Sequence, residues 1–298
     1  MAKKSTLIVV AGPTAVGKTA FCIDLAKRLQ TEIISADSRQ FYRETVIGTA
    51  APTAEEMDGI AHHFVGHLSI HDYYNVSMYE QEAIAICNQL FEKYPYIILS
   101  GGSGLYLDAV CEGIDDLPDV DTHLRNNLQQ QWEAEGIEPL LNQLFALDED
   151  YYHIVDKKNP KRVLRALEVC MQTGKTYTSL RLQSQKERNF NVLKLCLTLP
   201  RQPLCERINH RTDVMMQNGF LHEAEQLYPQ KHLNALNTVG YKELFAYIEG
   251  KTSLDFAVEK IKTNTRRYAK RQMTWFNKKG DYRFFEPSQL EQIMKLIT

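Results

Sequence analysis

The sequence predicts an α/β fold, in which helices flank a parallel sheet and an all-helical segment is inserted into the same domain. Short β-rich runs alternate with helical stretches in the amino-terminal third of the chain. A glycine-rich loop joins the first of these runs to the first helix. A later stretch, 121–189, has helical character throughout and contains no β-rich run. These three observations together favour a parallel sheet with an insertion.

The glycine-rich loop, 12–19 (GPTAVGKT), matches the phosphate-binding pattern of a glycine, four residues and Gly-Lys-Ser/Thr. A predicted strand at 6–11 precedes it, and helical spacing at 20–29 follows. Strand, loop and helix in this order make an anion cradle from backbone N–H groups and the helix amino end, as in P-loop NTPase-like folds. We expect Lys18 to neutralise phosphate oxygens and Thr19 to bind Mg²⁺. The expected diphosphate-binding residues are Gly12, Pro13, Thr14, Ala15, Val16, Gly17, Lys18 and Thr19.

The remaining elements follow from hydrophobic periodicity and from residues that begin or end helices. Ser77 and Glu80 form a predicted capping box at the start of a helix that ends near residue 94. Asn159-Pro160 begins another helix, which Gly174 ends. Further strands are predicted at 31–35, 62–68, 95–100, 192–199 and 282–285, and further helices at 204–217, 220–227, 239–248, 253–278 and the carboxyl end.

An acidic, proline-containing segment at 112–121 marks a change in this pattern. We therefore expect a core α/β domain made of 1–118 and 190–298, and a helical insertion at 119–189. Because no internal repeat or low-complexity tract interrupts the chain, one domain with one insertion is the simplest organisation.

Composition is that of an ordinary globular protein of 298 residues, and its formal charge of −2 gives no global signal for nucleic-acid binding. Its six cysteines form no CxxC pair, which argues against a zinc site or a disulfide framework and indicates a reducing compartment. The sequence shows no transmembrane stretch and no sorting signal. We expect a cytoplasmic monomer that does not bind membranes.

Two segments are locally basic, and each is either a solvated helix face or a surface for a phosphate backbone. In the second segment Tyr268, Trp275 and Phe276 lie between the cations, which favours a duplex or folded RNA as the partner. The basic residues are Lys157, Lys158, Lys161, Arg162, Arg165, Lys175 and Arg181 in the first segment, and Lys260, Lys262, Arg266, Arg267, Lys270, Arg271, Lys278 and Lys279 in the second.

Asp37 follows a predicted strand next to the loop, so its carboxylate is a candidate general base; the alternative is a carboxylate that only stabilises its turn. Arg207 and Arg211 lie four apart on one helix and could bind a pyrophosphate. Surface ion pairs with Glu206 or Asp213 are the simpler reading of this pair. His62-His63 is not a metal site, because adjacent strand residues point to opposite faces.

The buried strand at 95–100 ends in Gly-Gly-Ser-Gly and not in the Mg²⁺-binding Asp of typical phosphate-loop kinases and ATPases. This absence indicates that the cradle holds a diphosphate that is not ATP. A small-molecule or nucleotide kinase remains the main alternative enzyme. A non-catalytic RNA-binding protein is a further alternative, which the intact Lys18, Thr19 and Asp37 argue against.

The sequence resembles the tRNA dimethylallyltransferases (tRNA isopentenyltransferases), and the motifs that carry this resemblance extend from the first strand to about residue 279. Their order and spacing agree with that family. They are GPTAVGKT at 12–19, SADSRQFYRETVIGTA at 35–50, GGSGLY at 101–106, NPKRVLRALEV at 159–169 and AKRQMTWF at 269–276.

This resemblance implies Mg²⁺-dependent transfer of a dimethylallyl group from dimethylallyl diphosphate to N6 of the adenosine immediately 3′ to the tRNA anticodon. It implies that Asp37 is the general base and that Ser103 and Arg211 bind the diphosphate, so that these three are the catalytic residues. It also implies that the helical insertion binds the anticodon stem-loop. The implied tRNA-binding residues are Asp37, Ser38, Arg39, Gln40, Ser103, Arg125, Lys161, Arg162, Val163, Leu164 and Arg165, and the stretch 237–242 aligns less securely with another such segment.

Ser103 stands where the family usually has Thr, so the hydroxyl is kept. Prenyl transfer to free adenine nucleotides is an alternative within the same chemistry, but an enzyme of that kind has no need of the helical insertion.

Overall fold

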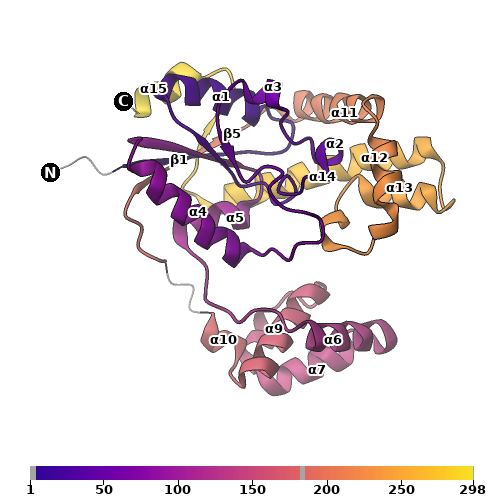
Figure 1. Ribbon diagram of the computed structural model, residues 1–298. Helices are drawn as coiled ribbons and strands as arrows, with labels where there is room; N and C mark the ends of the chain where they lie inside the picture. Colours follow the sequence, from indigo (N-terminus) through magenta and orange to yellow (C-terminus); the bar gives the residue numbers. More distant parts are fainter. Residues whose placement is uncertain (1–4, 182–184, 298) are drawn as a thin grey trace. The chain divides into compact units, whose positions relative to one another are not determined.

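The computed structural model describes residues 5–181 and 185–297, and its centre is a six-stranded sheet of order β3-β2-β4-β1-β5-β6 (Figure 1). Every strand pair in this sheet is parallel. The predicted α/β class is therefore confirmed. The strands are β1 (Thr6–Ala11), β2 (Ile33–Ser35), β3 (His62–His63), β4 (Tyr96–Gly101), β5 (Asn191–Leu197) and β6 (Arg283–Phe285).

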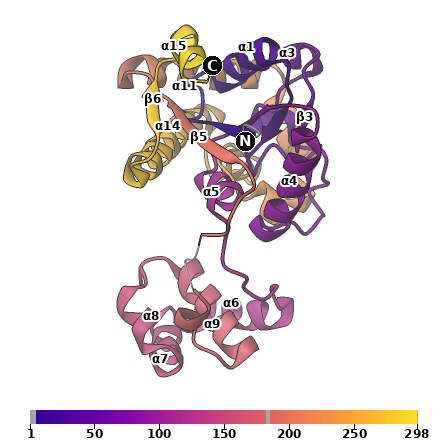
Figure 2. The same cartoon turned by 90° about the vertical axis from the view of Figure 1, so that its left-hand side faces the viewer.

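Helices cover both faces of the sheet, which is why the central strands are apolar along their whole length. Leu7 and Val9 of β1 pack in one hydrophobic cluster, whereas Ile8 and Val10 pack in another. One face carries α1 (Lys18–Leu29) and α15 (Leu290–Ile297), and the other carries α4 (Val76–Phe91), α5 (Gly104–Glu112) and α14 (Leu254–Lys279) (Figure 2).

The other helices outside residues 113–186 are short, apart from α11. Among the described residues, none of the helices combines the length and the apolar character that crossing a bilayer requires. The helices are α2 (Val46–Thr49), α3 (Ala54–Met57), α11 (Arg201–Gln217), α12 (Phe220–Leu227) and α13 (Tyr241–Ile248), with 3₁₀ turns η1 (Tyr228–Gln230) and η2 (Asn234–Leu236).

Two compact units make up the chain: unit 1 contains residues 1–112 and 187–298, and unit 2 contains 113–186. This division lies a few residues before each boundary expected from the sequence, at 119 and 189. In its described residues unit 2 is entirely helical, and it has a hydrophobic core of its own around Leu140, Leu144 and Leu167. Its helices are α6 (Thr122–Glu135), α7 (Glu138–Leu147), α8 (Glu149–Ile154), α9 (Pro160–Thr173) and α10 (Tyr177–Leu180).

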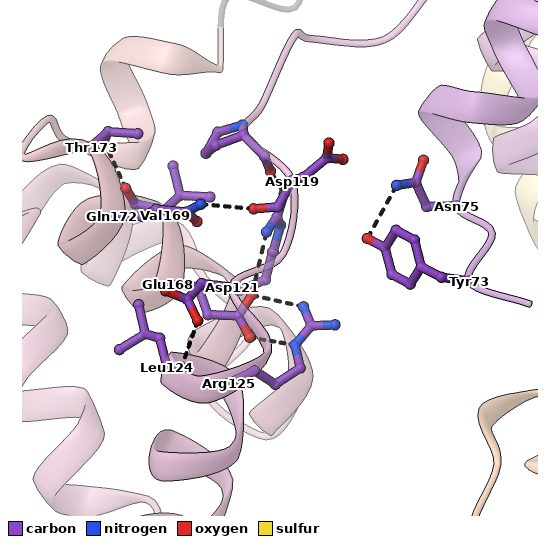
Figure 3. Close-up of polar contacts among 12 residues, drawn as sticks. Tyr73, Asn75, Asp119, Asp121, Leu124, Arg125, Glu168, Val169, Gln172 and Thr173 are labelled. Carbon is purple, nitrogen blue, oxygen red and sulfur yellow. Dashed lines mark hydrogen bonds and ion pairs between the residues drawn. The ribbon is translucent and has the colours of Figure 1, made fainter.

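A buried carboxylate organises the polar contacts of unit 2 (Figure 3). Glu168 of α9 is fully buried, and its Oε2 accepts a hydrogen bond from Nη2 of Arg125 at 2.7 Å. Nη1 of Arg165 lies 3.3 Å from the same oxygen. Since a buried charge is costly unless it is paired, both arginines have a structural role. Arg125 joins α6 to α9, whereas Arg165 lies on α9 itself and donates to the carbonyl of Pro118 at 2.7 Å.

The local prediction at the start of α4 was wrong. The amino-terminal cap of α4 is Asn75, whose Oδ1 accepts from the N–H of Met78 at 2.9 Å, so Ser77 and Glu80 form no capping box. The prediction for α9 is confirmed, because Asn159 occupies the cap position, Pro160 begins the helix and Gly174 ends it, although the side chain of Asn159 makes no capping bond. The strand predicted at 62–68 is limited to two residues.

Arg188 connects the two segments of unit 1 that precede and follow unit 2. Its Nε donates to the carbonyl of Val110 at 2.9 Å and its Nη2 to that of Ala109 at 2.8 Å, and both carbonyls belong to the last turn of α5. Nη2 also pairs with the buried Glu80 at 2.7 Å. The guanidinium therefore satisfies carbonyls that the end of a helix leaves without partners.

Candidate active site

The loop between β1 and α1 has the backbone of an anion cradle. Gly17 has φ 105° and Ala15 has φ 65°, so both residues adopt the left-handed region. A Cβ on Gly17 would lie 3.2 Å from Nη2 of Arg207, so a side chain at this position would also crowd that guanidinium. Left-handed conformations of non-glycine residues such as Ala15 are costly and concentrate at functional sites.

Lys18 lies within this loop, and its Nζ donates to the carbonyls of Gly12 and Pro13, each at 3.0 Å. Withdrawal of the ammonium from water lowers the pKa of Lys18 to about 8, an effect that the negative charge of Asp37 opposes and the positive charge of Arg211 reinforces. Lys18, the predicted phosphate-binding lysine, therefore loses its proton at a lower pH than an exposed lysine does.

Arg207 and Arg211 both face the loop from α11. Nη2 of Arg211 donates to Oγ1 of Thr14 at 2.6 Å, and burial lowers the pKa of this guanidinium from its ordinary value. Glu206 instead accepts from Gln202, and Asp213 pairs with Lys262. The surface ion pairs that the sequence alone favoured are therefore not made by either arginine within the described residues.

Asp37 occupies the turn after β2. Its Oδ1 accepts from the N–H of Arg39 at 3.1 Å, so the side chain stabilises its turn. This is the alternative role that the sequence predicted for Asp37. The same side chain lies in the wall of both cavities described below. A turn-stabilising role and a role in chemistry are therefore compatible for this carboxylate.

Ser103 follows the glycine turn at the end of β4 and joins that turn to the Asp37 turn. Its Oγ accepts from the N–H of Ser38 and lies within hydrogen-bonding distance of Oγ of Ser38, both at 3.2 Å. The side chain of Tyr268 also interacts with Ser103, and burial raises the pKa of Tyr268 to about 12. Ser103 thus sits in a polar network next to the predicted base.

Two neighbouring cavities of unit 1 share part of their lining. The first, of about 700 Å³, is lined by the phosphate loop, including Lys18 and Thr19. The second, of about 480 Å³, is lined by Tyr268, Arg271 and other polar residues. Four residues line both cavities: Thr14, Asp37, Thr49 and Arg211. Volumes of this size suit small organic ligands, so one molecule on the loop and another in the second cavity would meet beside Asp37.

The predicted tRNA-binding residues in the turn after β2 are divided between the two cavities, since Gln40 lines the first, and they are partly engaged in internal contacts. Ser38 and Arg39 line this cavity. Nη1 of Arg39 donates to the carbonyl of Asn234 at 3.0 Å, and Nε2 of Gln40 donates to the carbonyl of Ala50 at 2.9 Å. These two side chains also hold neighbouring segments in place.

In unit 2 the predicted tRNA-binding residues have different environments. Val163 and Leu164 lie in the hydrophobic core, so any contact that they make with RNA is limited to their backbone. Arg125 and Arg165 are held by Glu168, as described above. Lys161 and Arg162 are exposed on the first turn of α9. The structure therefore leaves these two as the cations of this motif that are most open to a partner.

Gln272 was missed as a site residue in the sequence, and Tyr268 was noted only as an aromatic residue of the second basic segment. Both lie on α14; Gln272 reaches the glycine turn through Gly102, and Tyr268 lines the second cavity. The signal for Gln272 was the AKRQMTWF motif, which places a glutamine among residues of an amphipathic helix without indicating that its side chain is buried.

The adjacent histidines have separate partners, as expected from their alternation along a strand. Nδ1 of His62 lies 2.8 Å from the carbonyl of Ile60, and Nε2 of His63 lies 2.7 Å from Oε2 of Glu32. Across 5–181 and 185–297, no group of three His, Cys, Asp or Glu side chains is arranged to hold a metal ion. A metal at the loop would thus depend on hydroxyl oxygens and on its ligand's phosphates.

Comparison with known proteins gives consistent matches over nearly the whole chain. A family model described as IPP transferase matches residues 40–279. The protein named tRNA dimethylallyltransferase 1 of Bacteroides thetaiotaomicron is 52% identical over 292 residues, which cover 98% of this chain and 95% of the relative. That of Phocaeicola vulgatus is 50% identical, with 98% and 97% covered.

Solved structures show the same similarity. The full-length tRNA isopentenylpyrophosphate transferase of Bacillus halodurans has a TM-score of 0.73 and 34% identity, with 99% of this chain and 96% of that chain covered. A eukaryotic dimethylallyltransferase, described as acting on tRNA, has a TM-score of 0.77 and 28% identity, with 97% and 75% covered.

The low pKa of Lys18 predicts that anion binding at the loop weakens above pH 8. From pH 7 to pH 9 the protonated fraction of this lysine falls about tenfold, and we expect its contribution to pyrophosphate affinity to fall with it. Isothermal calorimetry with inorganic pyrophosphate measures this. Lys18→Arg, whose side chain stays charged, is the control for titration of pyrophosphate itself. If pyrophosphate affinity changes with pH in the same way in both proteins, titration of Lys18 does not control binding.

Proposed function

The chain belongs to the IPP transferase family, and we infer that it transfers a dimethylallyl group from dimethylallyl diphosphate to N6 of the adenosine immediately 3′ to the anticodon of tRNA. The family resemblance indicated by the sequence motifs is confirmed. The observation that carries the inference for this chain is the position of Asp37, whose side chain lines both the phosphate-loop cavity and the second cavity. A reaction that joins a diphosphate-bearing donor to a separate acceptor requires this arrangement.

On the donor side, the allylic carbon becomes positive as its C–O bond weakens, and negative charge builds up on the departing diphosphate. Loop amides, Lys18 and Arg211 surround the position where that charge would develop. Lys18 and Arg211 are both desolvated, so each stabilises an anion more strongly than an exposed cation does. Cleavage of this carbon–oxygen bond requires no transfer of the phosphoryl group itself.

We propose that Mg²⁺ accompanies the diphosphate and that the Thr19 hydroxyl binds it. Thr19 lies in the first turn of α1 and lines the loop cavity. Oxygen ligands suit Mg²⁺, which in such sites takes one or two protein ligands together with substrate phosphates. The loop fits this pattern because it offers a hydroxyl without a cage of carboxylates. When bound, the ion would neutralise charge on the leaving group.

On the acceptor side, adenine N6 is a poor nucleophile because its lone pair is delocalised into the ring. Asp37 would orient the amine and accept its proton as the C–N bond forms, while Oδ1 keeps its bond to the Arg39 N–H. The target base must leave the stacked anticodon loop to reach the site, which costs a few kcal/mol. Backbone contacts elsewhere on the protein must offset this cost.

We propose that unit 2 supplies part of those contacts through Lys161 and Arg162. Both cations stand in the first turn of α9, next to the positive end of the helix dipole. Cations there destabilise a helix, whereas an anion bound at the same place is stabilised by the dipole and by both side chains. A phosphate of the anticodon stem-loop fits this position. On α14 the exposed Arg267, Lys270 and Arg271 extend a second basic surface.

We propose that the protein acts as a monomer, because both cavities of the proposed site lie within unit 1. All six cysteines are free, which supports action in a reducing compartment such as the cytoplasm. The alternative function, that of a small-molecule or nucleotide kinase, has less support, because β4 ends in Gly101 without a Mg²⁺-binding acid.

The proposed function predicts label transfer from labelled dimethylallyl diphosphate to bulk tRNA and to no other acceptor tested. Parallel incubations with AMP, with ATP in place of the donor, and with no acceptor distinguish the alternatives. Label found only in AMP would indicate prenyl transfer to free nucleotides. Release of phosphate from ATP without any label transfer would indicate a kinase or ATPase.

Asp37→Asn is predicted to lower turnover about 10²–10⁴-fold, the usual contribution of a general base. The amide oxygen can still accept from the Arg39 N–H, so this change removes the base and keeps the turn. Single-turnover transfer to tRNA and a separate tRNA-binding titration measure the two effects. Asp72→Asn, at an exposed turn where Oδ2 accepts from the Ser69 N–H, is the matched control. Near-normal turnover with intact tRNA affinity would refute the role of Asp37 as base.

Lys161→Gln combined with Arg162→Gln is predicted to weaken tRNA binding and to flatten its dependence on salt. Loss of two phosphate contacts should reduce the slope of log K against log salt by about 1.4–1.8. Filter binding at several salt concentrations measures this, and pyrophosphate affinity should stay unchanged. The control is Lys27→Gln with Arg28→Gln, an equally charged pair in the last turn of α1. Equal slopes for the two double variants would show that unit 2 does not bind the phosphates.

A further inference from the structure

Gln272 of α14 links two segments of the active site that lie far from it in the sequence. Its Oε1 accepts from the N–H of Thr14 in the phosphate loop at 2.9 Å. Its Nε2 donates to the carbonyl of Gly102 in the glycine turn, also at 2.9 Å. The side chain is 6% exposed, so these two bonds satisfy a polar group that is withdrawn from water.

A glutamine can make both bonds at this position without any change of protonation. The Thr14 N–H needs an acceptor and the Gly102 carbonyl needs a donor, and a glutamine presents one of each on adjacent atoms. The lack of a side chain at Gly102 leaves space for Gln272, because a Cβ at Gly102 would lie 2.2 Å from Nε2 of Gln272. The position of the Gln272 side chain therefore depends on a glycine at 102.

The two segments that Gln272 joins belong to the two sides of the reaction. Thr14 also accepts from Arg211 through its hydroxyl, so it belongs to the cradle for the leaving group. Gly102 precedes Ser103, which accepts from the Ser38 N–H and so holds the turn that carries Asp37. We propose that Gln272 is a positioning residue that fixes the phosphate loop relative to the turn bearing Ser103, and through Ser38 relative to Asp37.

This proposal rests on the prenyl transfer proposed above, because it concerns the distance between the donor and the base. Displacement of reacting groups by about 1 Å can cost 10²-fold in rate. Loss of the link should therefore lower turnover while leaving the KM for tRNA nearly unchanged, because Gln272 is buried and offers the RNA no surface. The loop should also bind diphosphate less well once Thr14 has lost its backbone partner.

Two variants separate positioning from general stability. Gln272→Met keeps the length of the side chain and removes both bonds. Gln272→Glu keeps an acceptor for the Thr14 N–H but places an oxygen against the Gly102 carbonyl unless the carboxyl is protonated. Burial and the facing carbonyl both favour the protonated form. The glutamate variant should therefore regain activity as the pH falls, relative to the original protein.

The control is Phe276→Leu, one turn further along α14, where a fully buried ring packs in the core away from both bonds. We expect Gln272→Met to lose about 10²-fold in kcat with a tRNA KM within about threefold, and Phe276→Leu to lose thermal stability without this loss in kcat. The activity ratio of Gln272→Glu to the original protein is measured from pH 8.5 to pH 6 and should rise. Calorimetry with inorganic pyrophosphate alone should show weaker binding to Gln272→Met.

Equal kcat for Gln272→Met and Phe276→Leu at matched melting temperatures would overturn the proposal, and so would an activity ratio for Gln272→Glu that is flat with pH. If the original protein transfers no prenyl group at all, the proposed function fails. In that case the pyrophosphate measurement still tests whether Gln272 organises the loop, because unchanged pyrophosphate binding in Gln272→Met would exclude it.

Discussion

The parallel pairing of β1, β2 and β4 is the constraint on which the rest of the site depends. Its register places Ala11 beside Gly101 and Ser35 beside Ser100, so these three strands end at the same level of the sheet. The phosphate loop, the Asp37 turn and the glycine turn each begin where one of these strands ends. In parallel sheets ligands bind at this edge. A shift of one strand by a single residue would separate the cradle from the base.

Two cations at this edge are half-buried and hydrogen-bonded before any substrate arrives. Lys18 is held by loop carbonyls and Arg211 by the hydroxyl of Thr14, with Asp37 near enough to influence the pKa values of both. Little reorganisation is then needed when negative charge develops on a leaving group. The same loop geometry that serves nucleotide hydrolysis elsewhere thus suits the departure of a diphosphate from carbon.

Local sequence patterns predicted the positions of those candidate residues whose contacts are local. The loop motif predicted that Lys18 and Thr19 follow a strand and begin a helix, which is where they lie, and Asp37 was proposed because it comes shortly after a strand. Gln272 was not found, since its partners lie 258 and 170 residues away in the sequence. The capping box at Ser77 was wrong for the same reason: Glu80 is paired with Arg188, 108 residues later, and Asn75 caps the helix instead. The orientation of Arg207 and Arg211 toward the loop likewise depends on how α11 packs, which helical spacing alone does not determine.

The bonds of Arg188 have a consequence for the length of chain that can be accommodated between the two segments of unit 1. They hold the residues before and after unit 2 together within unit 1, at the last turn of α5 and the approach to β5. The entropy of closing a loop grows only slowly with its length once its ends are held in this way. Segments of very different size could therefore be accommodated between residues 112 and 187 without disturbing the sheet. A change in the length of this segment would leave the edge of the sheet that carries the phosphate loop unchanged.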